Sequence, residues 1–156
     1  MRKFLLVTVL MSILVPASGY AKGDVQDLRA TFAEILKSFR EKNLEAFLGH
    51  FHPDAVIFER NRLFPIDRSR ADRDDWADAV QLLFDRVINV EFVPKQIDYR
   101  VIDNTGMIWG FSKMKIDSRD ELASDLDSRF SVTLTFREDR WMIVAWHTSA
   151  PPASQD

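Results

Sequence analysis

The closing stretch RWMIVAWHTSAPP, residues 140–152, carries more information about the fold than any other part of the sequence. Two prolines end it, because proline cannot donate a hydrogen bond to a neighbouring strand. A strand with one face in water alternates apolar and polar residues. Strict alternation here gives two largely apolar faces, one with Trp141, Ile143, Ala145, His147 and Ser149, the other with Met142, Val144, Trp146 and Thr148. The stretch therefore predicts a strand that is covered on both faces.

The residues before this strand predict further strands with the same two-residue period. Residues 126–137 alternate apolar and polar side chains, as expected for a strand with one buried face. Two more long strands are predicted over 95–102 and 107–116, joined by the strong turn signal Asp-Asn-Thr-Gly, and a short one over 91–94. These strands form a mostly antiparallel meander.

The residues between about 24 and 87 mostly have helical periodicity instead. Apolar residues recur at three- and four-residue steps over 24–41, 43–51 and 72–87, with Asp24, Asn43 and Asp72 as N-caps. A short strand is predicted over 55–59. The expected fold is α+β: three N-terminal helices packed on one side of a curved, mostly antiparallel sheet.

The N-terminal segment has the features of a secretory signal peptide. Two basic residues precede an apolar run over 4–15, which is too short to span a bilayer, and Gly19-Tyr20-Ala21 resembles a cleavage site. We expect residues 1–21 to be removed, a single domain over 22–152 and a disordered tail over 153–156. The mature protein is then exported, periplasmic or secreted, with no membrane anchor.

Composition narrows the classes of partner and chemistry. The chain has no cysteine, so thiol chemistry and Cys-based metal sites are excluded. Without Arg2 and Lys3, the 24 acidic residues outnumber the basic ones by five, and no basic stripe is present. We therefore expect no nucleic-acid partner, and we also predict no metal and no cofactor. The two apolar faces of the closing strand predict a homodimer through the convex face of the sheet, the alternative being a cover formed by the chain's own tail or loops.

At this point the sequence resembles the SnoaL-like and ketosteroid-isomerase-like families, which have the cone-shaped fold of nuclear transport factor 2. The matching pieces are His52-Pro53-Asp54-Ala55-Val56, Arg129-Phe130-Ser131-Val132-Thr133, and Trp141-Met142-Ile143 with His147-Thr148-Ser149. One departure is the turn before Trp141, which is Glu138-Asp139 where these families often carry glycine. The resemblance covers residues 24–151. It implies that the helices and the curved sheet form a cone with an internal ligand pocket at the concave face, but the fold hosts many functions.

Five side chains are candidates for a site in this pocket. His147 is the candidate catalytic residue, as a base or hydrogen-bond donor. Arg129 could anchor a carboxylate, and Tyr99, His52 and Trp109 could contact a ligand. Each also has a structural interpretation: a half-buried histidine, a surface ion pair, or a wall of the core.

Two functions follow from these candidates. The favoured one is an exported domain that binds a small apolar or mildly acidic molecule without catalysis, because no carboxylate falls on an apolar strand face. The alternative is an isomerase, cyclase or dehydratase that uses His147 as base or donor and Arg129 as substrate anchor. The enzyme requires a histidine or carboxylate inside the pocket, whereas the binding domain requires a pocket walled by apolar side chains.

Overall fold

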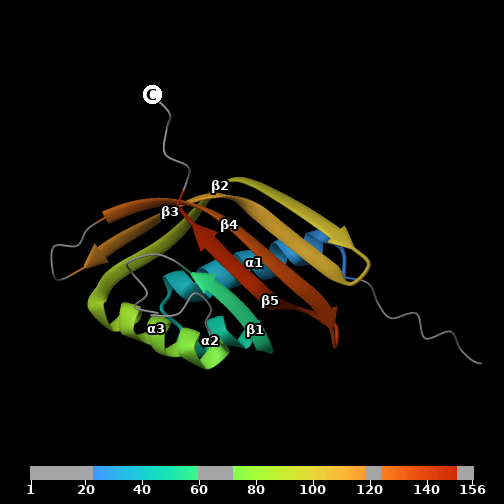
Figure 1. Cartoon of the computed structure of the whole chain (residues 1–156), viewed down its shortest axis with the longest axis horizontal. Coiled ribbons are helices and arrows are strands. Elements are labelled where there is room, and N and C mark those ends of the chain that lie inside the picture. Colours follow the sequence, from blue (N-terminus) through green and yellow to red (C-terminus); the bar gives the residue numbers. More distant parts are fainter. Residues whose placement is uncertain (1–22, 60–71, 119–123, 151–156) are drawn as a thin grey trace, which may run out of the picture.

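The computed structural model describes residues 23–59, 72–118 and 124–150 of the 156-residue chain. These residues form helices and strands in an α+β arrangement, as predicted (Figure 1). The helices are α1 (Val25–Arg40), α2 (Leu44–Gly49) and α3 (Arg73–Arg86). The strands are β1 (Phe51–Glu59), β2 (Val87–Ile102), β3 (Thr105–Ser118), β4 (Ser124–Arg137) and β5 (Arg140–Ser149). The predicted signal peptide and C-terminal tail lie outside the described residues.

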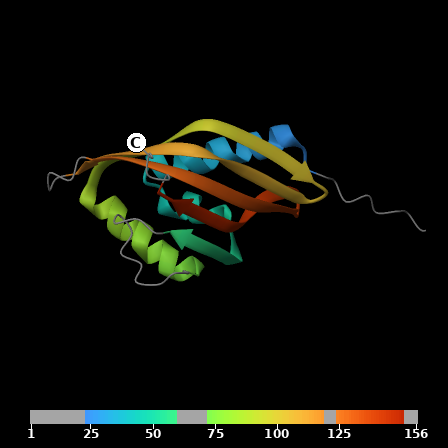
Figure 2. The ribbon, with the colours of Figure 1, turned by 45° about the horizontal axis from the view of Figure 1, so that its top comes forward.

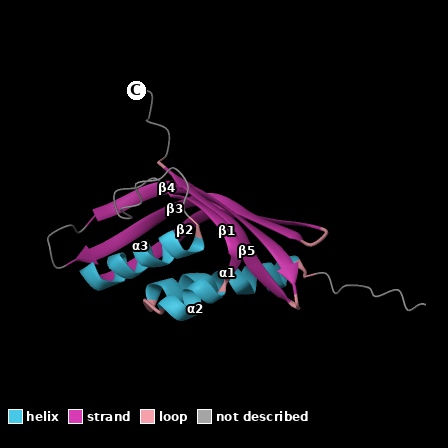
Figure 3. Ribbon diagram, turned by 60° about the horizontal axis from the view of Figure 1, so that its bottom comes forward, coloured by secondary structure: helices cyan, strands magenta, loops and turns pink. Residues whose placement is uncertain are grey.

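The strands form one sheet with the order β1-β5-β4-β3-β2. All neighbouring pairs are antiparallel except β1 and β5, which are parallel. The three helices lie on the same side of the sheet (Figure 3). We call this side the inner face and the opposite, convex side the outer face.

Side-chain caps start the helices where the sequence predicts. Asp24 accepts hydrogen bonds from the backbone of Gln26 and Asp27 at 2.7 and 2.8 Å, and Asp27 completes a capping box. Asn43 caps α2 through the amide of Ala46 at 3.0 Å, and Asp72 caps α3. The second helix is shorter than the predicted 43–51.

The second helix ends early because the chain enters the sheet directly after it. The carbonyl of His50 accepts a hydrogen bond from the Ile143 amide at 2.8 Å, and Phe51 pairs with Ile143 in the β1–β5 ladder. Strand β1 therefore starts at Phe51, four residues before the predicted short strand.

A β-bulge makes β2 one long strand where the sequence analysis predicted two. Gln96 and Ile97 together lie opposite the single residue Gly110, and Gln96 has a φ of 48°. A Cβ atom added to Gly110 would lie 2.5 Å from the Gln96 carbonyl oxygen, so only glycine fits there. Pro94 is tolerated within β2 because this strand is at the edge of the sheet.

A second bulge corrects the predicted faces of β5. Thr133 pairs with Ala145 and Leu134 pairs with Ile143, which leaves Val144 without a partner on β4. Alternation therefore changes phase at Val144, and the inner face carries Trp141, Ile143, Trp146 and Thr148, all at most 5% exposed. The prediction that Trp141 and His147 share a face is wrong. The inference that β5 is apolar on both faces rested on that pattern.

The core lies between the helices and the inner face. Leu28, Phe32, Ile35 and Phe39 of α1 are buried against it, and the ring of Phe32 stacks on Phe130 at 5.9 Å between centroids. No helix within residues 23–59, 72–118 and 124–150 is long and apolar enough to cross a membrane.

Candidate functional site

A cavity of about 20 Å³ lies between the helices and the inner face of the sheet. All three helices and three of the strands contribute to its wall. Its lining residues come from the part of the fold close to α3 and the first half of β2. Figure 2 shows α3 and the start of β2 at one end of the sheet and the β2–β3 turn at the other. We call it the inner cavity, and its wall is formed by Leu36, Phe39, Phe47, Trp76, Phe92, Met114, Trp146 and Thr148.

Hydroxyl and indole groups are the polar groups of this wall. The Trp146 indole Nε1 donates a hydrogen bond to the Thr148 hydroxyl oxygen at 2.9 Å, and both residues are buried. The wall residues include neither an acidic nor a basic side chain. Nearby on the inner face, the hydroxyl oxygens of Ser112 and Ser128 lie 2.8 Å apart. Among the described residues, the wall therefore has no side chain that could act as a general acid or base at neutral pH.

His147 lies on the outer face, away from the inner cavity. It is exposed, and its ring is 6.5 Å from the ring of Phe58 in an edge-to-face arrangement. His147 also pairs with Phe58 in the parallel β1–β5 ladder. The bulge at Val144 accounts for this placement, because it turns Trp146 and Thr148 inward and the residue between them outward.

Arg129 and Trp109 are on the outer face as well. The Arg129 Nε donates to the Ser149 hydroxyl at 2.8 Å, which satisfies one of its donors within the sheet. The Trp109 side chain is 41% exposed on β3. The structure therefore brings three of the five predicted site residues to the outer face and none of these three to the inner cavity.

Tyr99 is on the inner face but does not line the inner cavity. The guanidinium carbon of Arg29 on α1 lies 4.5 Å from the centre of its ring, and Phe32 contacts it edge-to-face at 6.3 Å. Burial raises the pKa of the Tyr99 phenol, and the positive charge of Arg29 opposes that rise. Tyr99 is therefore a half-buried residue of β2 that packs against α1.

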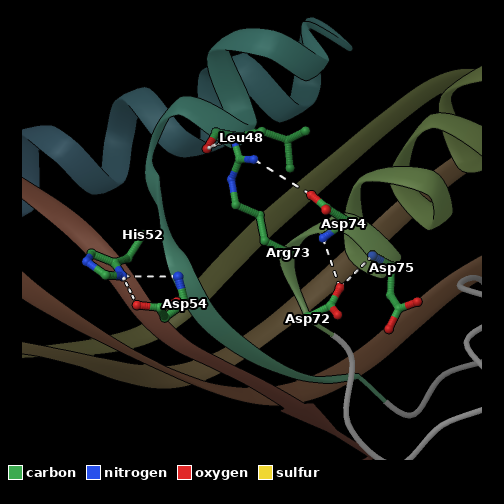
Figure 4. A network of polar contacts seen from close by, with 7 residues as sticks. All are labelled: Leu48, His52, Asp54, Asp72, Arg73, Asp74 and Asp75. Carbon is green, nitrogen blue, oxygen red and sulfur yellow. Dashed lines mark hydrogen bonds and ion pairs between the residues drawn. The ribbon is translucent and has the colours of Figure 1, made fainter.

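His52 lies at the start of β1 in a local arrangement with Asp54 (Figure 4). The Nδ1 atom of His52 accepts a hydrogen bond from the Asp54 backbone amide at 3.1 Å, and an Asp54 carboxylate oxygen is 3.8 Å away. The Nδ1 atom of His52 is thereby hydrogen-bonded within β1 itself. Within the described part of the chain, no three His, Cys, Asp or Glu side chains gather as a metal site.

Two cations secure α3, which forms one wall of the inner cavity. Arg73, in the first turn of α3, donates to the carbonyl of Leu48 in α2 at 3.4 Å (Figure 4). At the other end of α3, Lys42 Nζ donates to the Val87 carbonyl at 3.0 Å and to the Phe84 carbonyl at 3.4 Å. The bonds of Lys42 satisfy carbonyls at the C-terminal end of α3, where a helix leaves its last carbonyls without partners.

The sequence analysis missed Thr148 as the hydroxyl of the cavity wall. Strict alternation puts Thr148 on the face opposite Trp141, and only the bulge at Val144 brings the two to the same side. No local signal, such as a glycine or proline, marks this bulge in the sequence.

Comparisons with solved structures agree on the fold. A candidate calcium/calmodulin-dependent protein kinase II association domain from Xanthomonas campestris superposes with a TM-score of 0.69 at 18% identity, covering 85% of this chain and 91% of that one. A candidate dehydratase of the nuclear transport factor 2-like family from Streptomyces avermitilis gives 0.68 at 11%, covering 83% and 97%. A candidate scytalone dehydratase from Novosphingobium aromaticivorans gives 0.67 at 10%, covering 84% and 93%.

At these identities the superpositions show the fold alone. No curated protein matches the chain by sequence. A family model described as a SnoaL-like domain matches residues 28–154, most of the chain and every described strand. The chain therefore belongs to the SnoaL-like domain family and has the nuclear transport factor 2-like fold.

Proposed function

We propose that this protein is a non-catalytic SnoaL-like domain that binds a small apolar molecule in the inner cavity. The observation that carries this proposal is the composition of the wall. Its side chains are aromatic or aliphatic, and their polar groups are one hydroxyl and two indole N–H groups. General acid–base catalysis needs a titratable side chain in contact with the reacting atoms. The described wall offers surface for apolar contact but no such side chain.

The size of the cavity sets a condition on binding. A volume of about 20 Å³ holds about one water molecule, so a larger ligand must move part of the wall. Leu36 is only partly buried, and Met114 is unbranched with several rotatable bonds. These two side chains are the ones that can give way at least cost.

The enzyme alternative has weaker support. His147 and Arg129, its expected base and anchor, are exposed on the outer face. The dehydratases among the similar structures are 10% and 11% identical to this chain, which is too distant to transfer an activity. A mildly acidic ligand is also disfavoured, because a carboxylate in an apolar cavity without a cation loses its hydration uncompensated.

Benzene titration followed by methyl NMR tests the binding proposal. We expect the Met114 methyl resonance to shift saturably, because Met114 is in the wall. Leu36→Phe fills space beside the cavity and should weaken binding several-fold. Leu82→Phe, at a half-buried position of α3 outside the wall, is the matched control. Shifts that stay linear with benzene concentration, or that are unaffected by Leu36→Phe, contradict the proposal.

We also propose that the outer face forms a homodimer. Phe58, Trp109 and Phe111 are 44%, 41% and 46% exposed on this face. Around them are side chains of both signs, including an ion pair between Lys95 and Asp127 at 3.5 Å. In the strand pairing, His147 and Ser131 lie between Phe58 and Trp109, so exposed aromatic and polar side chains share this face. Exposed aromatic side chains are typical of an interface, and a surface with both charges can be complementary to a second copy of itself.

Export is proposed from the N-terminal segment. Its basic start, apolar run and small residues before Lys22 are typical of a signal peptide. Expression of the full chain in a bacterial host should yield a periplasmic or secreted protein whose intact mass corresponds to a start at Lys22. A protein of full-length mass in the cytosolic fraction contradicts the proposal.

A further inference from the structure

We infer that the inner cavity selects an uncharged ligand that carries one hydrogen-bond-accepting oxygen, such as a small aryl ketone, and that Thr148 donates the bond to it. This inference rests on the proposed function and specifies the ligand class of the same site.

The donor follows from the hydrogen-bonding capacity of the Thr148 hydroxyl. A hydroxyl has one hydrogen to donate and two lone pairs to accept with. Trp146 Nε1 donates to this oxygen at 2.9 Å, which fixes the hydroxyl as the acceptor of that bond. Among the hydrogen bonds of the described residues, none uses the Thr148 hydroxyl hydrogen. A buried hydroxyl that keeps its hydrogen unpaired loses about 1–3 kcal/mol, so an acceptor on a ligand would stabilise the complex.

We expect the ligand to be uncharged because the cavity wall offers no cation to pair with a negative charge. Lys42 and Arg73, the cations that secure α3, donate to backbone carbonyls of Val87 and Leu48. The wall residues themselves carry no cation. A carboxylate in the cavity would therefore be buried without a counter-charge, whereas a carbonyl oxygen needs only the one donor that Thr148 offers.

The aromatic walls favour a flat apolar body on that ligand. The ring of Trp146 meets the ring of Phe92 edge-to-face, with 5.9 Å between centroids, and Phe39 meets Phe47 at 5.3 Å. A planar ring can extend such an arrangement with favourable edge-to-face or offset contacts. Thr148 lines the cavity together with Trp146, to which its hydroxyl is bonded, so we expect a single polar atom on the rim of a bound ring to reach that hydroxyl.

Three probes of similar size test the inference in calorimetric or NMR titrations: acetophenone, its hydrocarbon isostere α-methylstyrene, and benzoate. Thr148→Val removes the hydroxyl at nearly constant shape, and Thr148→Ser retains it. We expect Thr148→Val to weaken acetophenone binding about five- to tenfold and α-methylstyrene binding by less than twofold, because only the ketone loses a hydrogen bond. Thr148→Ser should bind both probes as the wild type does. Benzoate should bind the wild type at least tenfold more weakly than acetophenone.

A readout on the wild type keeps the test decisive if Thr148→Val does not fold. The Trp146 indole N–H resonance should move further with acetophenone than with α-methylstyrene, because a hydroxyl that donates becomes a stronger acceptor. Equal shifts with both probes, equal losses of both in Thr148→Val, or benzoate binding as tight as acetophenone binding would overturn the inference while leaving an apolar binding cavity. No saturable binding of any probe would overturn the proposed function together with it.

Discussion

His50 shows how a single residue can couple stability to pH. It caps the C-terminus of α2, and its carbonyl bonds to the Ile143 amide of β5. Burial lowers the pKa of its imidazole, with Arg140 adding to the effect and Glu34 opposing it. The folded protein therefore takes up this proton at lower pH than the unfolded chain does.

The sign of this effect gives the first prediction. Below the unfolded-state pKa of about 6.5, the unfolded chain binds the proton first, so the free energy of unfolding should fall as the pH drops. His50→Gln removes the titration and should flatten the dependence as the pH falls below about 6.5. Urea unfolding at several pH values measures it. Identical slopes in the two proteins would show that His50 does not carry this dependence.

The turn between β4 and β5 is built from unfavourable residues. Glu138 and Asp139 have φ values of 50° and 58°, the left-handed region that costs most side chains about 1 kcal/mol or more. Asn-Gly suits such a two-residue turn best. Glu138→Asn with Asp139→Gly should therefore raise the free energy of unfolding by about 1–2 kcal/mol. Asp98→Gly, an exposed strand residue without positive φ, should lower it, as measured by urea unfolding.

Gly110 on β3 permits the bulge at Gln96 and Ile97 that makes β2 a continuous strand. Its missing side chain leaves room for the Gln96 carbonyl, and that contact holds the bulge. Gly110→Ala should lower the free energy of unfolding by about 1–3 kcal/mol through this overlap. Gly49→Ala is the control, because nothing lies within 4 Å of a Cβ atom there and its φ is not positive. A loss at Gly49 as large as that at Gly110 would refute the assignment.

Lys42 has a comparable effect on α3. Its ammonium group bonds the carbonyls at the C-terminal end of that helix, where the helix dipole also favours a cation. Lys42→Met should destabilise the fold by about 1–2 kcal/mol. Lys37→Met, which removes only a weak surface contact with Glu41 at 4.0 Å, should change it by less than about 0.5 kcal/mol. Thermal unfolding separates the two, and equal effects would argue against the α3 bond.

Most elements could be predicted from the sequence because their signals are local. The caps at Asp24, Asn43 and Asp72 and the alternation of β4 act within a few residues, and the structure confirms them. The two bulges depend instead on pairing with residues of another strand. Gln96 is displaced against Gly110, and Val144 is skipped between Thr133 and Leu134. Such pairings are not visible to a rule that reads one strand at a time.

The cavity is the part of the site that sequence reasoning could not reach. The pocket itself was expected from the family resemblance, but its hydroxyl is defined by a phase change within β5. Among the three expected site residues on the outer face, His147 is placed there by this phase change, whereas Arg129 follows the regular alternation of β4. Family membership, by contrast, depends on patterns spread along the chain, and those were readable.

The dimer is a prediction about the whole molecule, and it no longer rests on the pattern of β5. Its support is now the exposed Phe58, Trp109 and Phe111. Phe111→Glu places a charge among these side chains and should convert the dimer to monomer in analytical ultracentrifugation. Ala33→Glu, exposed on α1, should leave the mass unchanged. A wild type that sediments as a monomer at micromolar concentration would contradict the dimer.

The bulge at Val144 also determines which face of the sheet each later side chain of β5 occupies. If Val144 were paired like its neighbours, with no residue skipped, every later side chain would change face, carrying the imidazole of His147 toward the cavity and the indole of Trp146 into water. The contact of Trp146 with Phe92 in the core stabilises the present arrangement of these faces. Within this fold, then, the pairing of one residue of β5 with β4 decides whether an indole or an imidazole faces the cavity.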